Sequence, residues 1–279
     1  MTDGPDTARS GLEPLALALR AHLVRRIELG QRRTPAPACA SEASGVLVPV
    51  ARAPTTRTAV APDSGLFRET VRESEAAAAN RARAAECQDL DALRAQVASC
   101  TACRLCHTRT QTVFADGSPR ARVLFIGEAP GQHEDEQGVP FVGQAGRLLT
   151  DIIQKGMRLA RSEVYIANVL KCRPPENREP AADEKELCTP YLDRQIELVN
   201  PELLITLGLH AARHVLKSPA PMARLRGRVH VLSGRKVVAT YHPAYLLRNP
   251  EMKKPCWEDI QLAMRELGLS SPGKPRTGS

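Results

Sequence analysis

The sequence predicts an α/β fold: a three-layer αβα arrangement around a mostly parallel, four-stranded central sheet, preceded by a largely disordered N-terminal extension. Beyond about residue 120, short runs of β-branched residues alternate with amphipathic segments, a pattern typical of a parallel sheet with helices on both faces. Before residue 90 the pattern is different. Residues 31–80 contain few large apolar side chains, too few to offset the entropy of ordering.

The N-terminal extension is expected to span residues 1–90. Residues 12–29 place apolar side chains at helical spacing among arginines, which predicts a short amphipathic helix, and we expect it to dock a protein partner. The Ala-, Pro- and Ser-rich stretch 31–80 is expected to be a disordered linker. A second helix is predicted over 84–99.

The catalytic domain is expected to span residues 91–268, followed by a flexible tail, 269–279. Its predicted strands are residues 122–127, 164–169, 203–207, 229–232 and 236–240. Its predicted helices are residues 145–157, 182–199, 209–216 and 257–267. In parallel sheets, ligands bind beyond the carboxyl ends of the strands. We therefore expect the segments that follow strands to converge on one edge, namely 127–141, 168–178, 208–210 and 241–250.

Composition and charge narrow the class of protein. The 279-residue chain has a net charge of +8 and a pI of about 9.3, and most of the positive excess lies beyond residue 90. This favours a polyanionic partner such as nucleic acid. No apolar run reaches the ~20 residues of a membrane span, and the first residues do not resemble a secretion signal. We expect a soluble, cytoplasmic protein.

Four of the eight cysteines have the spacing of metal ligands. Cys100 and Cys103 form a CxxC pair, and Cys172 and Cys188 flank a polar loop. Four thiolates suit either zinc or an iron–sulfur cluster, and spacing alone does not decide between them. Cys106 offers a third local ligand, and unrelated buried thiols are the remaining interpretation.

Two further motifs carry chemistry. The loop that begins at Gly127 contains two glycines and a proline, so that its backbone can approach a ligand closely; it matches neither GxGxxG nor the P-loop pattern. His242 precedes Pro243, and on the residues alone it either caps a turn or donates a hydrogen bond to a ligand. Asn168 lies at a strand end, where on the residues alone it either makes a structural hydrogen bond or binds a ligand.

These motifs resemble the family 4 uracil-DNA glycosylases, the iron–sulfur type. The resemblance runs from Cys100 to about Leu267, and its matching segments are Cys100–Leu105, Gly127–Gly131, Glu134-Asp135, Pro140–Gly146, Asn168–Arg178, Thr206–Gly208, Arg226-Gly227 and His242–Pro250. It implies a uracil-DNA glycosylase-like fold and an enzyme that flips uracil out of DNA and hydrolyses its N-glycosidic bond. The product would be an abasic site, without strand cleavage.

The resemblance also implies a [4Fe-4S] cluster with a structural role. Its ligands would be Cys100, Cys103, Cys172 and Cys188, with Cys106 outside the set. A related branch, which becomes covalently attached to uracil, has an added histidine in the loop that is 173–178 here. This chain has no histidine there, which disfavours that activity.

Three residues are the expected catalytic set. A neutral His242 would donate an N–H to uracil O2 as the ring departs as an anion, because a preorganised donor stabilises developing charge. Glu128 and Asn177 are rival candidates for positioning the attacking water.

Five residues are expected to bind uracil. By resemblance the backbone of Gly127 and Ala129 would hold O2, Phe141 would stack on the ring, and Glu134 would exclude thymine by its bulk near C5. Asn168 would distinguish uracil from cytosine, since a site built for one edge leaves polar groups unpaired with the wrong base.

DNA contacts are expected from the segment after His242. Leu246 would wedge into the gap left by the flipped base, with Tyr245 or Leu247 sharing the task, and Arg248 would contact phosphate. The expected partner is uracil-containing DNA, with no membrane and with the protein monomeric. Two alternatives stay open: a catalytically inactive iron–sulfur nucleic-acid-binding protein associated with replication or repair, and a zinc hydrolase with four thiolate ligands.

Overall fold

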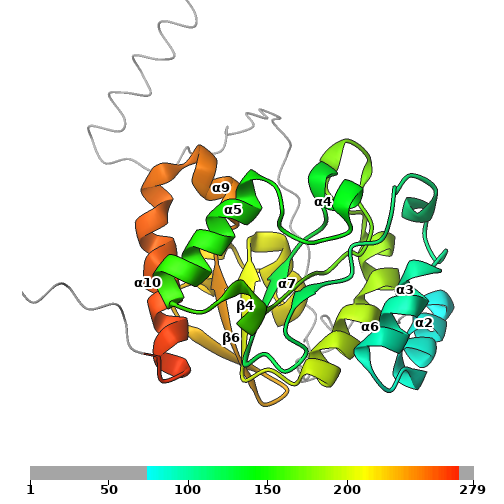
Figure 1. Ribbon diagram of the computed structural model, residues 1–279, viewed down its shortest axis with the longest axis horizontal. Coiled ribbons are helices and arrows are strands. Elements are labelled where there is room, and N and C mark those ends of the chain that lie inside the picture. The colour runs from blue at the N-terminus through cyan, green and yellow to red at the C-terminus, as the bar shows by residue number, and fades with distance from the viewer. Residues whose placement is uncertain (1–73, 270–279) are drawn as a thin grey trace, which may run out of the picture. The chain divides into compact units, whose positions relative to one another are not determined.

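The computed structural model describes residues 74–269, and six of its strands form one sheet (Figure 1). The strands are β1 (Asp116–Gly117), β2 (Val123–Gly127), β3 (Tyr165–Asn168), β4 (Leu203–Leu207), β5 (Val229–Leu232) and β6 (Arg235–Thr240). Their order is β1-β3-β2-β4-β6-β5. The four central strands run parallel, and both edge strands are antiparallel. The predicted parallel sheet is confirmed, with an antiparallel strand added at each edge.

The order of the central strands places a crossover point beside β2. The chain passes from β2 to β3 on one side and returns to β4 on the other. At such a point the connecting loops diverge and leave a crevice beyond the carboxyl ends of the strands. In this chain the crevice lies where Gly127, Asn168 and Leu207 end their strands.

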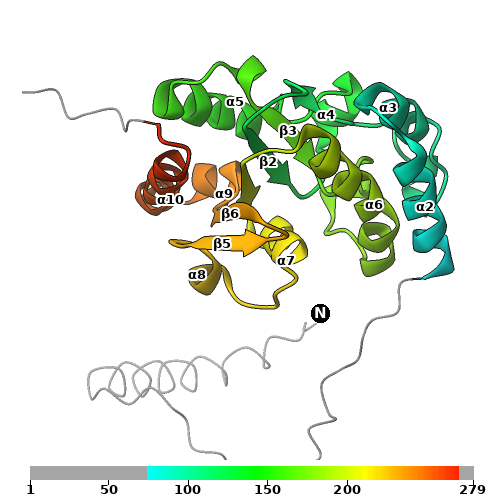
Figure 2. The ribbon, with the colours of Figure 1, turned by 90° about the horizontal axis from the view of Figure 1, so that it is seen from below.

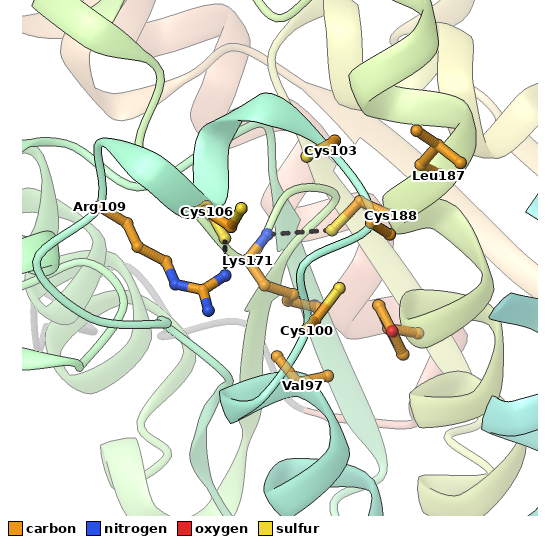
Figure 3. Close-up of a pocket in the computed structure, with 11 residues that line it drawn as sticks. Val97, Cys100, Cys103, Cys106, Arg109, Lys171, Leu187 and Cys188 are labelled. Carbon is orange, nitrogen blue, oxygen red and sulfur yellow. Dashed lines mark hydrogen bonds between the residues drawn. The ribbon is translucent and has the colours of Figure 1, made fainter. Parts of the chain in front are cut away.

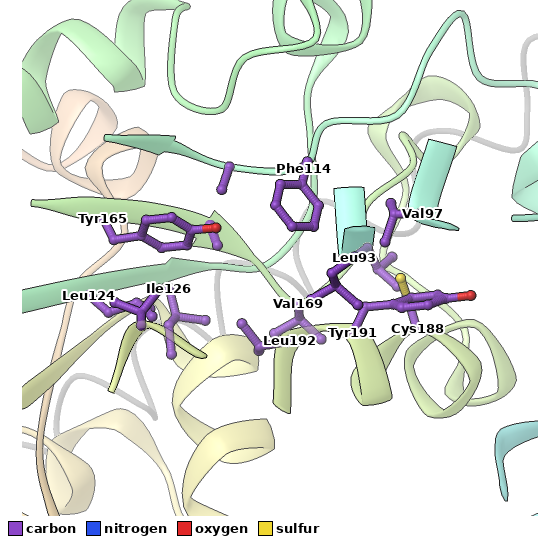
Figure 4. Close-up of a cluster of buried hydrophobic side chains, with 14 of the residues drawn as sticks. Leu93, Val97, Phe114, Leu124, Ile126, Tyr165, Val169, Cys188, Tyr191 and Leu192 are labelled. Carbon is purple, nitrogen blue, oxygen red and sulfur yellow. The ribbon is translucent and has the colours of Figure 1, made fainter. Parts of the chain in front are cut away.

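Both faces of the sheet are covered, because successive side chains of a strand point to opposite faces. In β2, Leu124 and Ile126 pack with helices α3 (Leu90–Ala98), α6 (Ala182–Val199) and α7 (Leu209–Leu216), while Val123 and Phe125 pack on the other side. Figure 4 shows the first of these layers around Leu93, Val97 and Leu192. This alternation yields the predicted three-layer αβα fold.

The opposite face carries α5 (Gln144–Asp151), its π-helical continuation η2 (Ile152–Met157) and α10 (Lys253–Glu266). Figure 2 shows α5 and α10 on one side of the sheet and α6 and α7 on the other. The remaining elements are short: α4 (Gln132–Gln137), α8 (Met222–Leu225), α9 (Pro243–Arg248), η1 (Arg104–His107), η3 (Arg161–Glu163), η4 (Pro175–Asn177) and η5 (Pro250–Met252). None of the described helices is long and apolar enough to cross a membrane.

The N-terminal side of the domain corrects two predictions. The predicted linker, 31–80, extends too far, because α2 (Glu75–Glu86) begins within it. The predicted helix 84–99 is in fact parts of two helices, since α2 ends at Glu86 and Asp89 caps α3 by accepting a hydrogen bond from Ala92 N at 2.8 Å. The periodicity of large apolar residues could not reveal α2, because the residues it buries are small or polar: Ala77, Asn80 and Ala84.

Helix α2 packs against α6. Asn80 Nδ2 donates to Leu187 O at 2.9 Å, and Ser74 N donates to Glu186 Oε1 at 2.6 Å. The folded domain therefore begins before the predicted boundary at residue 91. The predicted partner-docking helix, 12–29, and residues 270–279 of the tail lie outside the described residues.

Candidate active site and cysteine cavity

A cleft of about 680 Å³ lies beyond the carboxyl ends of the four parallel strands. Its volume is typical of a small-molecule site. Residues from all four strand ends line it, including seven predicted site residues: Glu128, Ala129, Glu134, Phe141, Asn168, Asn177 and His242. The topology thus brings together segments that are more than 100 residues apart in the sequence.

Gly127 is buried at the end of β2, next to the cleft-lining residue Glu128 and directly opposite Asn168 in the β2–β3 register. A Cβ atom on residue 127 would overlap Asn168 Oδ1 and come within 2.6 Å of Phe141 Cζ. Only glycine leaves room for both side chains at once. The glycine thus permits an amide and an aromatic ring to meet at the strand ends.

Asn168 is 2% exposed, and its Oδ1 has no hydrogen-bond partner within residues 74–269. A buried acceptor without a partner costs about 1–3 kcal/mol, so such atoms usually serve a ligand. The oxygen faces the space shared with Phe141. This amide is therefore ready to accept a hydrogen from a bound molecule.

Phe141 adopts a left-handed backbone conformation, with φ of 55°. This region is rare for non-glycine residues, and such strain tends to occur at binding sites. The ring is 7% exposed and its centroid lies 5.6 Å from that of His242, with the planes tilted by 33°. The two rings form adjacent walls of the cleft.

His242 caps helix α9: its Nδ1 accepts a hydrogen bond from Ala244 N at 3.1 Å. Burial, together with the charge of Arg248, lowers the pKa of His242 to about 4. The imidazole is therefore neutral at pH 7, and its proton resides on Nε2. The capping role and the donor role, which the sequence left as alternatives, are compatible because they use different ring nitrogens.

Glu134 organises the walls rather than presenting a free carboxylate. Its Oε1 accepts from Val142 N and Gly143 N at 2.9 Å each, and its Oε2 accepts from Gly131 N at 3.1 Å. These bonds tie the loop after β2 to the loop that carries Phe141. The side chain lines the cleft, as its predicted steric role requires.

The carboxylate of Glu128 lines the cleft and lies beside His210 and Glu179. His210 Nδ1 lies 3.0 Å from Glu179 Oε1 and 3.8 Å from Glu128 Oε1. Burial raises the pKa of Glu128, and the charge of His210 lowers it. His210 was not among the sequence-predicted site residues; the one pointer to it was its position within the segment 208–210 that follows a strand.

The four predicted metal-ligating cysteines line a second, separate cavity (Figure 3). Cys100 and Cys103 come from the segment before η1, Cys172 follows β3, and Cys188 belongs to α6. Arg109 Nη1 donates to Cys172 Sγ at 3.2 Å, and Lys171 N donates to Cys188 Sγ at 3.3 Å. Two of the four sulfur atoms thus accept hydrogen bonds, which favour the thiolate. Burial outweighs these bonds and raises the pKa of Cys172 to about 11 and that of Cys188 to about 12.

These sulfur atoms do not form a preformed tetrahedral metal site within the described residues. Within the described residues, only Glu128, Glu179 and His210 form a group of three or more Cys, His, Asp or Glu side chains with ligand atoms within 4.8 Å of one another. A tetrahedral zinc site with Zn–S bonds of about 2.3 Å would hold its sulfur atoms about 3.8 Å apart. No three of the cysteine sulfurs described in residues 74–269 meet this 4.8 Å limit.

Known proteins match the part of this chain that forms the sheet and the cleft. A model of the uracil DNA glycosylase superfamily matches residues 114–261. The type-4 uracil-DNA glycosylase of Sulfurisphaera tokodaii is 41% identical over 189 residues, which cover 65% of this chain and 86% of that protein. The type-4 enzyme of Thermotoga maritima is 43% identical over 173 residues, covering 60% of this chain and 89% of its own. The chain belongs to the type-4 uracil-DNA glycosylases.

A type-5 uracil-DNA glycosylase of Pyrobaculum aerophilum also matches, at 34% identity over 146 residues, which cover 47% of this chain and 64% of that protein. The matched glycosylase region contains the whole strand framework of the cleft. The family predicted from the motifs is therefore confirmed.

One predicted DNA contact of the glycosylase is wrong in its placement. Leu246 was expected on an exposed loop, but it is 1% exposed and packs in the core against α5 and α10. The reason is that residues 243–248 form helix α9 rather than a loop, so that one side of the segment faces inward. Leu247, 43% exposed, occupies the outward side.

The remaining predicted residues lie at the rim. Arg248 is exposed and lines the cleft at the end of α9. Asn177 is also exposed, and its Oδ1 already accepts from Arg173 Nε at 2.8 Å. Of the two candidates for positioning water, Glu128 is the more enclosed and has an oxygen without a hydrogen-bond partner among the described residues.

Proposed function

We propose that this protein removes uracil from DNA by hydrolysing the bond between uracil N1 and deoxyribose C1′, leaving an abasic site for base excision repair. The observation that carries the proposal is the unpartnered Oδ1 of Asn168, buried beside Phe141 and His242 in one cleft. Family membership supports the same activity.

Recognition of the base follows from the edge that each pyrimidine presents. Uracil offers a donor at N3 and an acceptor at O4, which match the oxygen and the NH₂ group of Asn168. Cytosine presents the reverse pattern, so both amide atoms would be left unpaired in a buried site. Phe141 supplies the stacking surface, and the wall held by Glu134 limits space for a methyl group.

His242 stabilises the leaving group. When the N1–C1′ bond breaks, the electron pair departs with uracil, and negative charge spreads to O2. The neutral imidazole donates from Nε2 while Nδ1 stays fixed by Ala244 N, so the donor is already oriented before charge develops. A preorganised donor of this kind contributes about 2.7–4 kcal/mol to transition-state stabilisation.

Glu128 acts on the sugar side. Its carboxylate would orient a water molecule toward C1′ and counter the positive charge that the sugar gains. The water oxygen then bonds to C1′ and gives up a proton, which Glu128 can accept. Asn177 is the rival candidate, but it is exposed and its oxygen is already occupied by Arg173.

DNA binding falls to helix α9 and the basic rim of the cleft. A flipped base leaves a gap in the stack, and apolar wedges fill such gaps in other DNA-distorting proteins. Leu247 is the exposed apolar side chain of α9, and we assign it the role first expected of Leu246. Arg248 beside it would contact a phosphate.

The four cysteines would hold a [4Fe-4S] cluster, whose ligand chemistry fits four thiolates. When bound, it would supply a structural link between the segment before η1, the loop after β3 and helix α6. The cleft residues described above lie in a separate cavity, so the cluster is assigned no chemical step. The resemblance to the iron–sulfur type of glycosylase supports a cluster over the zinc-hydrolase alternative.

Membership of the glycosylase family and a fully assembled cleft weigh against the alternative of an inactive nucleic-acid-binding protein. We further propose a monomer that acts in the cytoplasm on the chromosome, since uracil-containing DNA is its substrate. Docking of a protein partner by residues 12–29 stays a prediction.

The test is release of uracil from an oligonucleotide with a single uracil, followed by alkaline cleavage of the abasic product. Wild type is expected to cleave, and Asn168→Asp is expected to lose that activity, because the new carboxylate cannot donate to O4. Asn200→Asp, on the exposed end of α6, is the matched control and should cleave normally. Absence of cleavage by cluster-loaded wild type on both single- and double-stranded DNA would reject the proposal.

A further inference from the structure

Lys171 lies between the two cavities, three residues after Asn168 and directly before Cys172. It is 1% exposed, one of the largest fully buried side chains among the described residues. Its Nζ donates to the backbone oxygen of Asn168 at 2.6 Å and to Gln195 Oε1 at 2.5 Å. Its backbone N donates to Cys188 Sγ (Figure 3). One residue therefore contacts both the base-reading strand end and the cysteine cavity.

The surroundings hold this contact in place. Gln195 Nε2 donates to Phe114 O at 3.1 Å and to Tyr165 Oη at 3.2 Å. These bonds fix the orientation of the Gln195 amide, so that its oxygen faces Lys171. Gln195 also belongs to α6, the helix that carries Cys188.

The charge of Lys171 needs a counterpart. An ammonium group removed from water is costly unless an opposite charge lies near. Both acceptors of its Nζ are neutral oxygens. Lys171 lines the same cavity as the four cysteines, which would carry net negative charge once they hold an iron–sulfur cluster. Arg109, bonded to Cys172 Sγ, is a second cation on the same group.

We propose that Lys171 is a positioning residue that couples the cluster to uracil recognition. Its buried ammonium balances the charge of the cluster, and the same ammonium holds the backbone oxygen of Asn168, which sets the position of the base-reading amide. The inference rests on the proposed function, because it assumes both the cluster and the role of Asn168. Outer residues that surround a metal group commonly tune its affinity and its potential.

Two variants separate the charge from the hydrogen bond. Lys171→Met removes both. Gln195→Glu keeps Lys171 and its bond to Asn168, but it places a carboxylate against the ammonium and so cancels the charge locally. Lys155→Met is the matched control, since Lys155 is exposed on η2 and pairs only with Asp151 in the described structure. Each protein is purified with its cluster, and iron content, midpoint potential, KM and kcat are measured.

Both Lys171→Met and Gln195→Glu are expected to shift the midpoint potential to more negative values, because less positive charge near the cluster disfavours the added electron. Lys171→Met is further expected to raise KM for uracil-containing DNA roughly 10-fold, as the loss of one charged hydrogen bond implies. Gln195→Glu should leave KM near that of wild type, and Lys155→Met should change neither quantity.

The charge-balancing role would be overturned if Lys171→Met and Gln195→Glu both had the midpoint potential of Lys155→Met. The coupling to Asn168 would be overturned if KM in Lys171→Met were unchanged from wild type. If Lys171→Met does not fold, the potential of Gln195→Glu still decides the first point, and Lys171→Arg, which keeps the charge but moves the donor, decides the second. Lack of uracil release by wild type itself would instead reject the proposed function, while the potentials would still test the charge.

Discussion

Gly127 and Asn168 end neighbouring parallel strands directly opposite each other, and a side chain on Gly127 would occupy the space of the Asn168 amide oxygen. The ring of Phe141 borders the same space. The recognition site is therefore a three-residue contact in which the glycine contributes by having no Cβ.

Gly127→Ala is expected to displace Asn168 and Phe141 and to lower kcat/KM for uracil release about 100-fold, the scale of effect that a misplacement of about 1 Å produces. Steady-state kinetics on the single-uracil oligonucleotide measures this. Gly143→Ala is the control, because its Cβ would meet His133 Cδ2 only at an ordinary 3.4 Å. Equal activity of the two variants would contradict the assigned contact.

His242→Ala is expected to lower kcat about 100- to 1,000-fold through loss of the donor to uracil O2. The same change removes the cap of α9, so His242→Asn is the informative partner: asparagine can cap a helix but does not place an N–H where Nε2 lies. Both variants should lose activity, while only the alanine variant should lose about 1 kcal/mol of stability. Activity retained by His242→Asn would reduce His242 to a capping residue.

Glu128 is expected to set the acidic limb of the pH profile of kcat. Its pKa is raised above the ordinary value of 4.5, and the proposed role requires the carboxylate form, so activity should fall as the pH drops through that raised pKa. The limb should vanish in Glu128→Gln, together with most of the activity. His210→Gln should move it to higher pH, because the charge of His210 lowers the pKa of Glu128. If the acidic limb of the kcat profile in His210→Gln lies at the same pH as in wild type, His210 does not influence the ionisation of Glu128.

Folding stability should also depend on pH through two partly buried histidines. Burial lowers the pKa of both His214 and His242 to about 4 from 6.5. Between these values the unfolded chain binds protons that the folded chain does not, so the free energy of unfolding falls as the pH drops from 6.5 toward 4. Urea unfolding at pH 7 and pH 4.5 measures the difference. It should be smaller in His214→Asn, and an unchanged difference there would exclude His214 as a source.

Leu247→Ala is expected to reduce uracil release from double-stranded DNA more than from single-stranded DNA, because only the duplex has a stack to hold open. Leu246→Ala should instead lower the free energy of unfolding by about 2–5 kcal/mol, as large-to-small core changes do. Comparing both substrates and urea unfolding for the two variants separates the roles. Loss of duplex activity in a stably folded Leu246→Ala variant, with Leu247→Ala unaffected, would restore the original assignment.

Several features were predictable from sequence because they depend on local patterns. The parallel strands were found to within one residue at each end, since buried strands read as short, nearly continuous apolar runs. The cleft residues Phe141, Asn168 and His242 were assigned by the resemblance to the glycosylase family, and the strand pattern predicted that their segments converge. In a parallel sheet all such segments meet at the same edge.

Other features depended on contacts between distant segments. Helix α2 escaped prediction because it buries small residues on α6, and burial of alanine leaves no periodic pattern of large apolar residues. His210 joined the site through Glu128 and Glu179, residues from two other loops.

The amino-acid sequence by itself determined the family, the parallel α/β framework and the residues that end up around the cleft, because these follow from short motifs and from the periodicity of apolar side chains. Only the tertiary structure decided which of two adjacent leucines faces the solvent, and that Lys171 joins the cysteine cavity to Asn168. The reason is physical: the rotation of a six-residue helix about its axis and the path of one buried side chain are set by packing against residues far away in the chain.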